Sequence, residues 1–173
     1  MTQTLVPIDD ITSGQWVAVG AANEYLCIDE TLAGADDDTT YLSRTAAAMP
    51  TIWLGHVTAA VAPATTGGIV FGVRARERGP GLTSSLLAID LRSDADGTIA
   101  TRALTVSGTI WATTTWTLTV AEEALITDWP NLRGRIALQS TSALQVRVTA
   151  YEVTLPDPPP NLNGWWFPMW KFT

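Results

Sequence analysis

Residues 68–77, which read GIVFGVRARE, decide the fold class of this chain. Apolar side chains recur there at every second position, at Ile69, Phe71, Val73 and Ala75, while arginines occupy positions 74 and 76. Alternation of apolar and polar side chains is typical of a strand with one buried and one exposed face. We therefore predict a half-buried β-strand with its arginines on the outer face.

Segments of similar character extend from this strand in both directions. They are rich in Thr, Val and Ile, are separated by turn residues, and lack the period of an amphipathic helix. The strand candidates are residues 15–19, 24–28, 51–61, 85–93, 97–108, 108–120, 135–140 and 143–155. About nine or ten strands with frequent turns predict an all-β fold, an antiparallel two-sheet sandwich of the jelly-roll kind.

Two local features refine this prediction. The last two candidates are separated by a short Ser/Thr stretch, so we expect them to form a pair, with Val146, Val148 and Ala150 on one face. One short helix is expected within residues 119–132, because two glutamates stand where a helix dipole favours acids and Pro130 would end the helix. Its predicted inner face consists of Ala121, Ala124, Leu125 and Ile126.

A compositional break divides the 173-residue chain at Pro156. We predict a β-sandwich domain over residues 1–155 and an extension over 156–173, in which the PDPPP run forms a stiff spacer. Large aromatic side chains dominate binding interfaces, so the end of the extension is predicted to anchor on a partner, a sister subunit or its own domain. The candidate partner-binding residues are Trp165, Trp166, Phe167, Met169, Trp170 and Phe172.

Charge and hydropathy exclude several classes of protein. The net charge is −7 and lysine occurs once, so a basic surface that follows nucleic-acid phosphates is not expected. No apolar run is long enough to span a bilayer, and the first ten residues lack the pattern of a signal peptide. A single cysteine, Cys27, excludes an internal disulfide.

The sequence offers no catalytic signature. His56 is the only histidine and lies in a predicted strand without a nucleophile motif, so we expect a structural role for it. Cys27 alternates with apolar residues and is expected to be a buried, inert thiol. Acids cluster at positions 29–30, 36–38, and 94 and 96, where solvated turns are a better interpretation than a metal site. We therefore expect neither an enzyme nor a cofactor.

Two tryptophans could stack on sugars. Trp116 lies in the stretch TTTWT, and Trp111 lies just before this stretch. Trp111 and Trp116 are five positions apart, so on a regular strand they would point to opposite faces. At least one of them is therefore expected to be in the core.

Several short motifs follow one another in a definite order along the chain. They are Gly14 and Trp16; Ile28, Asp29 and Glu30; Asp36 to Asp38 and Tyr41; Ile126, Thr127, Asp128 and Trp129; Leu132, Arg133 and Arg135. In this order they resemble the β-sandwich structural modules of tailed-bacteriophage virions. The resemblance covers most of residues 5–155 and does not include the aromatic extension.

This resemblance implies a non-enzymatic virion component, made in the host bacterial cytoplasm. We expect a capsid-decorating or cement protein that binds the major capsid protein or other virion proteins, as a homo-oligomer and possibly a trimer. The alternative is a carbohydrate-binding module of a phage tail or fibre, for which Trp111 or Trp116 would contact the glycan. A glycan-degrading enzyme is the least favoured hypothesis, because paired acids with a defined separation are not recognisable.

Overall fold

The computed structural model describes residues 2–12, 14–45, 51–58, 60–63, 66–78, 84–93, 97–140 and 145–156. The candidate anchors from Trp165 to Phe172, and the acids Asp94 and Asp96, lie outside these residues. The elements are β1 (Gln3–Leu5), β2 (Val17–Val19), the 3-10 turn η1 (Tyr25–Cys27), β3 (Tyr41–Thr45), β4 (Thr51–His56), β5 (Val70–Arg78), β6 (Ser85–Arg92), β7 (Thr98–Val106), β8 (Ala112–Thr117), α1 (Val120–Glu123), β9 (Arg133–Ser140) and β10 (Gln145–Leu155).

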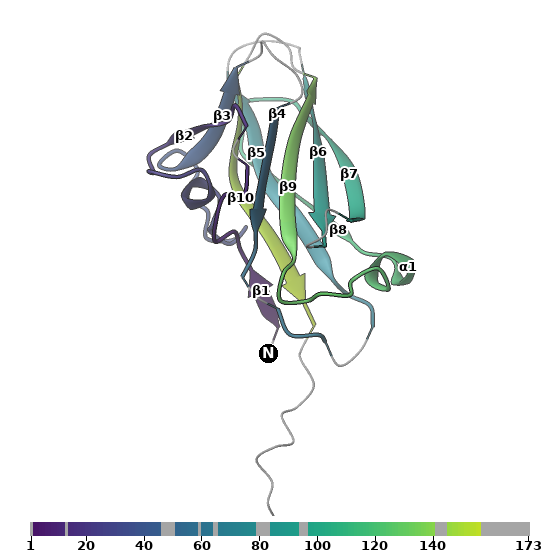
Figure 1. Ribbon diagram of the computed structural model, residues 1–173. Coiled ribbons are helices and arrows are strands. Elements are labelled where there is room, and N and C mark those ends of the chain that lie inside the picture. Colours follow the sequence, from purple (N-terminus) through teal and green to yellow (C-terminus); the bar gives the residue numbers. More distant parts are fainter. Residues whose placement is uncertain are drawn as a thin grey trace, which may run out of the picture.

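The strands form two antiparallel sheets that face each other, so the predicted β-sandwich is confirmed (Figure 1). Sheet I has the order β2-β3-β10-β5-β8, and β1 pairs with the end of β10. Sheet II has the order β4-β9-β6-β7. The final strand, β10, lies at the centre of sheet I, where it also has the longest run of buried residues.

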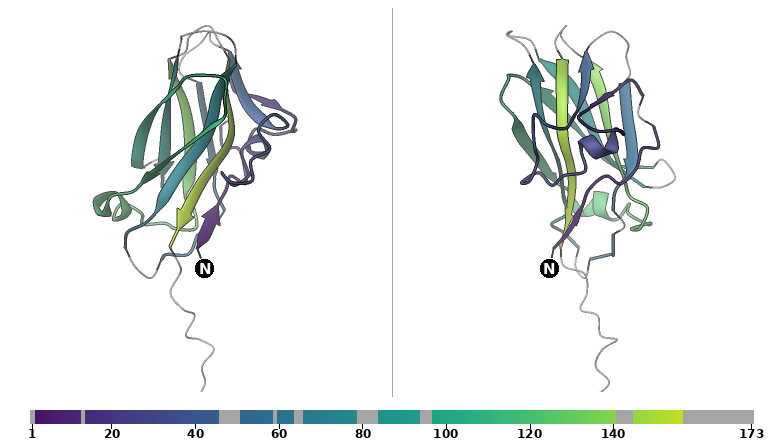
Figure 2. Two further views of the ribbon diagram at one scale, coloured as in Figure 1. Left: turned by 180° about the vertical axis from the view of Figure 1, so that it is seen from behind. Right: turned by 90° about the vertical axis from the view of Figure 1, so that its left-hand side faces the viewer.

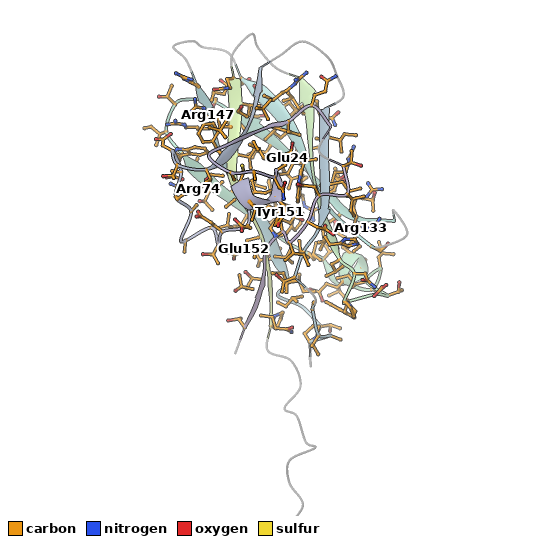
Figure 3. The ribbon with its side chains drawn as sticks, turned by 60° about the vertical axis from the view of Figure 1, so that its left-hand side comes forward. Glu24, Arg74, Arg133, Arg147, Tyr151 and Glu152 are labelled. Carbon is orange, nitrogen blue, oxygen red and sulfur yellow. The ribbon has the colours of Figure 1, made fainter. Side chains whose placement is uncertain are left out.

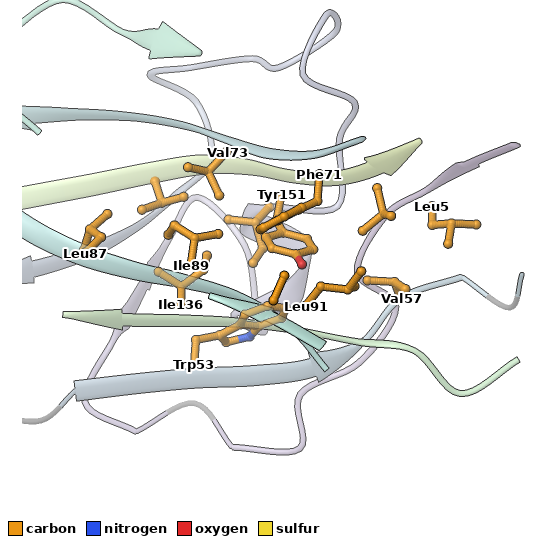
Figure 4. Packing of buried hydrophobic residues seen from close by; sticks show 14 of the residues in the cluster. Leu5, Trp53, Val57, Phe71, Val73, Leu87, Ile89, Leu91, Ile136 and Tyr151 are labelled. Atoms are coloured by element: carbon orange, nitrogen blue, oxygen red, sulfur yellow. The ribbon is translucent and has the colours of Figure 1, made fainter. Parts of the chain in front are cut away.

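The core lies between the sheets and follows the alternation of β5. Ile69, Phe71 and Val73 are fully buried, and Arg74 and Arg76 point to the outer face, as predicted. Tyr151 of β10 projects toward sheet II and donates its hydroxyl hydrogen to the backbone oxygen of Asp90 at 2.9 Å. Figure 4 shows this ring among the apolar side chains of both sheets.

Strands that follow one another often belong to different sheets, which sequence patterns do not reveal. The predicted pairing of the last two strands is wrong, because β9 is in sheet II and β10 is in sheet I. Each strand has one apolar face, and placing consecutive strands in opposite sheets brings these faces together across the core.

The predicted alternation of β10 is also interrupted. A bulge shifts the register between Val148 and Ala150, and all residues from 146 to 151 are buried. The extra residue returns Tyr151 and Val153 to the inner face, so Ala150 does not continue the inner row that begins at Val146.

The first forty residues close one side of the sandwich. Residues 8–12 run beside β4, where Leu54 N–H donates to the Thr12 oxygen at 2.7 Å, and β2 then pairs with β3 in the other sheet. Trp16, 3% exposed, lies in this crossing and packs into the core. Figure 2 (right) shows the N-terminal segment passing across this side.

The strand predicted at residues 24–28 is wrong. Tyr25–Cys27 forms the 3-10 turn η1, and the Ile28 oxygen accepts the backbone N–H of Tyr151 in the gap between β1 and β3. Cys27 and Ile28 are both fully buried. In a strand with one buried face, these two neighbouring side chains would point to opposite faces, and one of them would be exposed.

The helix α1 is shorter than predicted and does not extend to Pro130. A capping box joins Thr119 and Glu122, and Arg102 of β7 binds the Glu122 carboxylate through two 2.8 Å hydrogen bonds. Of the predicted inner face only Ile126 is buried, because the helix ends after one turn. Among the described helices, none is long or apolar enough to cross a membrane.

Candidate functional site

An acidic loop folds over the outer face of sheet I. Asp36 fixes the loop by accepting hydrogen bonds from the backbone and hydroxyl of Thr40, at 3.0 and 2.9 Å. Asp37 then binds Arg74 with both carboxylate oxygens, at 2.5 and 2.6 Å, and Asp38 pairs with Arg76. These acids therefore hold the loop on the sheet, which corrects the expectation that they are simply solvated.

Two aromatic rings lie on the same face, each stacked on an arginine. The Arg76 guanidinium carbon is 4.7 Å from the Trp111 ring centroid, and that of Arg147 is 4.2 Å from Tyr41. The two rings are 6.4 Å apart. The Arg147 guanidinium is buried beside the rings and therefore poorly hydrated. This burial lowers the pKa of Arg147 from its usual value.

We call these five residues the platform: Asp38, Tyr41, Arg76, Trp111 and Arg147. Figure 3 shows Arg147 and Arg74 on one side of the molecule, with Arg133 on the other. The platform is accessible to solvent at Trp111, which is only partly buried, and at Asp38, whose side chain is 64% exposed, whereas Tyr41 and Arg147 are buried. The indole nitrogen of Trp111 is buried and has no hydrogen-bond partner among the described residues.

The platform has the chemistry of a binding surface. A partly exposed aromatic ring can contact the apolar face of a sugar, and adjacent carboxylate and guanidinium groups can bind its hydroxyls. Ion pairs hold these groups in place before any ligand arrives, which reduces the entropy that binding would cost.

The predicted separation of the two tryptophans is confirmed. Trp116 packs against the core, with its ring centroid 5.5 Å from that of Phe71, whereas Trp111 contacts residues of the outer face. Of the two sequence candidates, only Trp111 therefore belongs to the platform. The sequence did not identify Tyr41, Arg76 or Arg147 as its neighbours.

His56 is held between two charged residues. Arg133 Nε donates to His56 Nε2 at 3.2 Å, so the ring proton lies on Nδ1, which donates to Asp9 at 2.8 Å. Both ring nitrogens are therefore occupied. This arrangement agrees with the predicted structural role of His56.

Cys27 is a buried thiol, as predicted. Its side chain is fully buried, and desolvation raises the pKa of the thiol above its ordinary value. The thiolate form that reacts with electrophiles is therefore disfavoured.

The described acids do not assemble a metal site. In the described ranges, no group of three or more His, Cys, Asp or Glu side chains is placed to hold a metal ion. Glu30 instead accepts the backbone N–H of Asp36 at 2.5 Å, and burial raises the pKa of Glu30.

Comparison with known proteins identifies a fold rather than a family. The chain matches no protein family, and no curated protein matches its sequence. Among solved structures, it is similar to an arabinose-bound GH51 α-L-arabinofuranosidase, with a TM-score of 0.51 and 8% identity over 84% of this chain and 22% of the other. The chain thus spans about a fifth of that enzyme's length.

Two further structures have lower TM-scores. A family 16 carbohydrate-binding module has a TM-score of 0.45 and 11% identity, with 81% of this chain and 85% of the module covered. The enzymatically active domain of tailspike protein 4 of bacteriophage CBA120 has a TM-score of 0.47 and 8% identity. The similarity covers 89% of this chain and 19% of the tailspike chain. At 8% identity, the similarity to the arabinofuranosidase is a similarity of fold alone.

Proposed function

We propose that this chain is a non-catalytic module that binds glycans through the platform on the outer face of sheet I. The observation that carries the proposal is the placement of Trp111, partly exposed and stacked on Arg76, beside the exposed carboxylate of Asp38. This role corresponds to the alternative drawn from the sequence rather than to capsid decoration.

The chemistry of the platform supports a neutral or weakly charged polyhydroxylated ligand. Arg74, Arg76 and Arg147 already interact with Asp37 or Asp38, so the surface offers both donors and acceptors without a strong excess of either charge. Such mixed polar groups beside an aromatic ring suit hydroxyl recognition better than they suit a phosphate or a long apolar chain.

A glycan array tests the proposal. Native protein is expected to bind a defined set of glycans, and Trp111→Ala is expected to lose them while keeping the native circular dichroism spectrum. Ile110→Ala is the matched control, because Ile110 is adjacent in sequence and 83% exposed. Absence of binding by native protein to every glycan, or unchanged binding by Trp111→Ala, would contradict the proposal.

The non-catalytic part of the proposal has its own assay. Glycans bound by the native protein should be recovered intact after prolonged incubation, as judged by chromatography and mass spectrometry. Release of shorter sugars by native protein, but not by a Trp111→Ala variant, would identify an enzyme instead.

A second candidate function is decoration of a virion, favoured by the order of sequence motifs and by the aromatic residues at 165–172. In this role the extension would attach the sandwich to capsid or other virion proteins. Deletion of residues 161–173 is then expected to abolish binding to particles that lack the protein. Full occupancy by the deleted form would exclude the extension as the anchor.

A further inference from the structure

A hollow lies between the last strands of the two sheets. β8 is the final strand of sheet I and β7 the final strand of sheet II, on the side of the sandwich away from the N-terminal crossing (Figure 1). The hollow between them has a volume of about 180 Å³. Its lining includes Ala75 of β5, Leu104 and Val106 of β7, and Ala112 and Thr114 of β8. It therefore opens at the margin of the core, where the edges of both sheets meet.

Small side chains on the inner row of β8 account for the hollow. Ala112, Thr114 and Trp116 point to the same face, because side chains alternate along a strand. Trp116 packs its ring against Phe71 in the core, with 5.5 Å between the ring centroids. Earlier in the same row, the alanine and threonine side chains are too short to do the same. An aromatic ring inserted beside them would continue the packing that Trp116 begins.

The hollow suits one uncharged aromatic side chain. Each of its described lining residues is apolar or carries a hydroxyl group, in a chain that contains 17 acidic residues. An apolar cavity of about 150 Å³ is large enough for benzene, so a hollow of about 180 Å³ accommodates one ring. The lining thus offers shape and apolar contact rather than ionic recognition.

The chain itself contains a segment of matching chemistry. Residues 158–173 include five aromatic side chains and a single charge, that of Lys171. They follow β10, whose end pairs with the beginning of β5 through Thr154 and Val70. The aromatic end of the extension is therefore a candidate occupant of the hollow, and the distance between them decides which chain supplies it.

The geometry favours a second copy of the chain. β10 ends at the level of Val70 and runs away from the hollow, which lies five residues along β5 at Ala75, about 17 Å back. Residues before prolines prefer extended backbone, so the PDPPP run is expected to carry the extension about 12 Å further away. A return of about 29 Å within one chain would use almost the full reach of residues 161–170, about 33 Å, and Trp165 and Trp166 would not arrive.

We propose that the hollow between β7 and β8 receives an aromatic side chain from the extension, residues 161–173, of a second copy of this chain. Each chain donates one extension and receives one, so the same contact is repeated in a closed oligomer. The inference is independent of glycan binding by the platform. It assigns the extension to a sister subunit rather than to a virion protein.

Sedimentation of native protein and of two variants tests the proposal. Native protein is expected to have a mass of at least twice the 18.5 kDa of one chain. Deletion of residues 161–173 removes the donor, and Ala112→Glu places a carboxylate in the hollow, so each change should raise the dissociation constant of the oligomer at least tenfold. Ala103→Glu is the matched control, because Ala103 is also exposed on an edge strand but points away from the hollow, and it should associate as native protein does.

A mixture of the two variants distinguishes exchange between chains from docking within one chain. The deleted form keeps an intact hollow, and Ala112→Glu keeps an intact extension, so the mixture should form a heterodimer that neither variant forms alone. Sedimentation with a fluorescent label on one variant measures it. Thr114→Trp is a second hollow variant, which fills the hollow with a ring of its own strand without adding charge, and it should give the same result.

Four results would overturn the proposal. A monomeric native protein, or a mixture without heterodimer, would exclude exchange between chains. If native protein is monomeric and a peptide of residues 160–173 binds the deleted form, the extension occupies the hollow of its own chain. Association that survives the deletion would exclude the extension, and native association of both Ala112→Glu and Thr114→Trp would exclude the hollow.

Discussion

Gly134→Ala tests the way in which Tyr151 joins the two sheets. A Cβ atom at position 134 would lie 2.6 Å from Cε1, 2.9 Å from Cζ and 3.0 Å from Cδ1 of Tyr151. Carbon atoms normally approach to about 3.5–4.0 Å, so the ring must move. Because the ring is fully buried and its hydroxyl bonds the Asp90 oxygen, any such movement strains the core and weakens this bond.

The expected cost follows from these contacts. Overpacking in a core costs about 1–3 kcal/mol and a lost hydrogen bond about 1 kcal/mol, so Gly134→Ala should lower the free energy of unfolding by about 2–4 kcal/mol. This corresponds to a fall in Tm of roughly 4–16 °C for a domain of this size. Urea denaturation followed by far-UV circular dichroism measures it.

A double-mutant cycle separates the steric contact from any backbone effect. In a Tyr151→Leu background the alanine should cost less, because the smaller side chain leaves room for its methyl group. Gly34→Ala is the control, since its new Cβ would meet only the Thr31 hydroxyl, at 3.1 Å. An unchanged stability for Gly134→Ala, or the same cost in both backgrounds, would refute the described packing of Tyr151.

Three further predictions concern α1, the thiol and the N-terminal crossing. Hydrogen bonds from Arg102 and Thr119 lower the pKa of Glu122 to about 2, so its ionised form stabilises the folded state above its usual pKa, and this stabilisation is lost as the pH falls from about 5 toward 2. Urea midpoints of native protein and Glu122→Gln should therefore differ at pH 6 and converge near pH 2; a constant difference would contradict the ion pair. Cys27 should react with a thiol reagent on the order of 100-fold more slowly in native protein than in urea, measured by absorbance, and equal rates would contradict its burial. Trp16→Ala should cost about 3–5 kcal/mol in the free energy of unfolding, because the side chain fills the crossing between the sheets, and a loss under 1 kcal/mol would show that the crossing is not packed.

The buried face of β5 could be predicted from sequence, but its partner strands could not. The alternation at residues 68–77 identified the inner and outer faces of β5 because side-chain direction is set by local backbone geometry. Sheet assignment depends on contacts across the core, so the separation of β9 and β10 was not predictable from their short connection. Residues 24–28 were misread because their apolar content reflects burial in a gap along β10, where a turn fits and a strand does not.

The platform was only partly accessible to sequence reasoning for the same reason. Trp111 and Trp116 could be placed on opposite faces, but the sequence did not distinguish which of them is in the core, and Arg76 could be placed on the outer face of its strand. Their contact with Tyr41 and with the acidic loop arises from the register of β5, β10 and β3, which brings together segments distant in the chain.

The affinity of native protein and Trp111→Ala for the best glycan from the array tests the central claim most directly. Isothermal titration should give an affinity at least about tenfold lower for Trp111→Ala, equivalent to about 1.4 kcal/mol, since stacking on an aromatic ring is lost. Ile110→Ala should bind as native protein does. Equal affinities for native protein and Trp111→Ala would contradict a glycan-binding role for the platform.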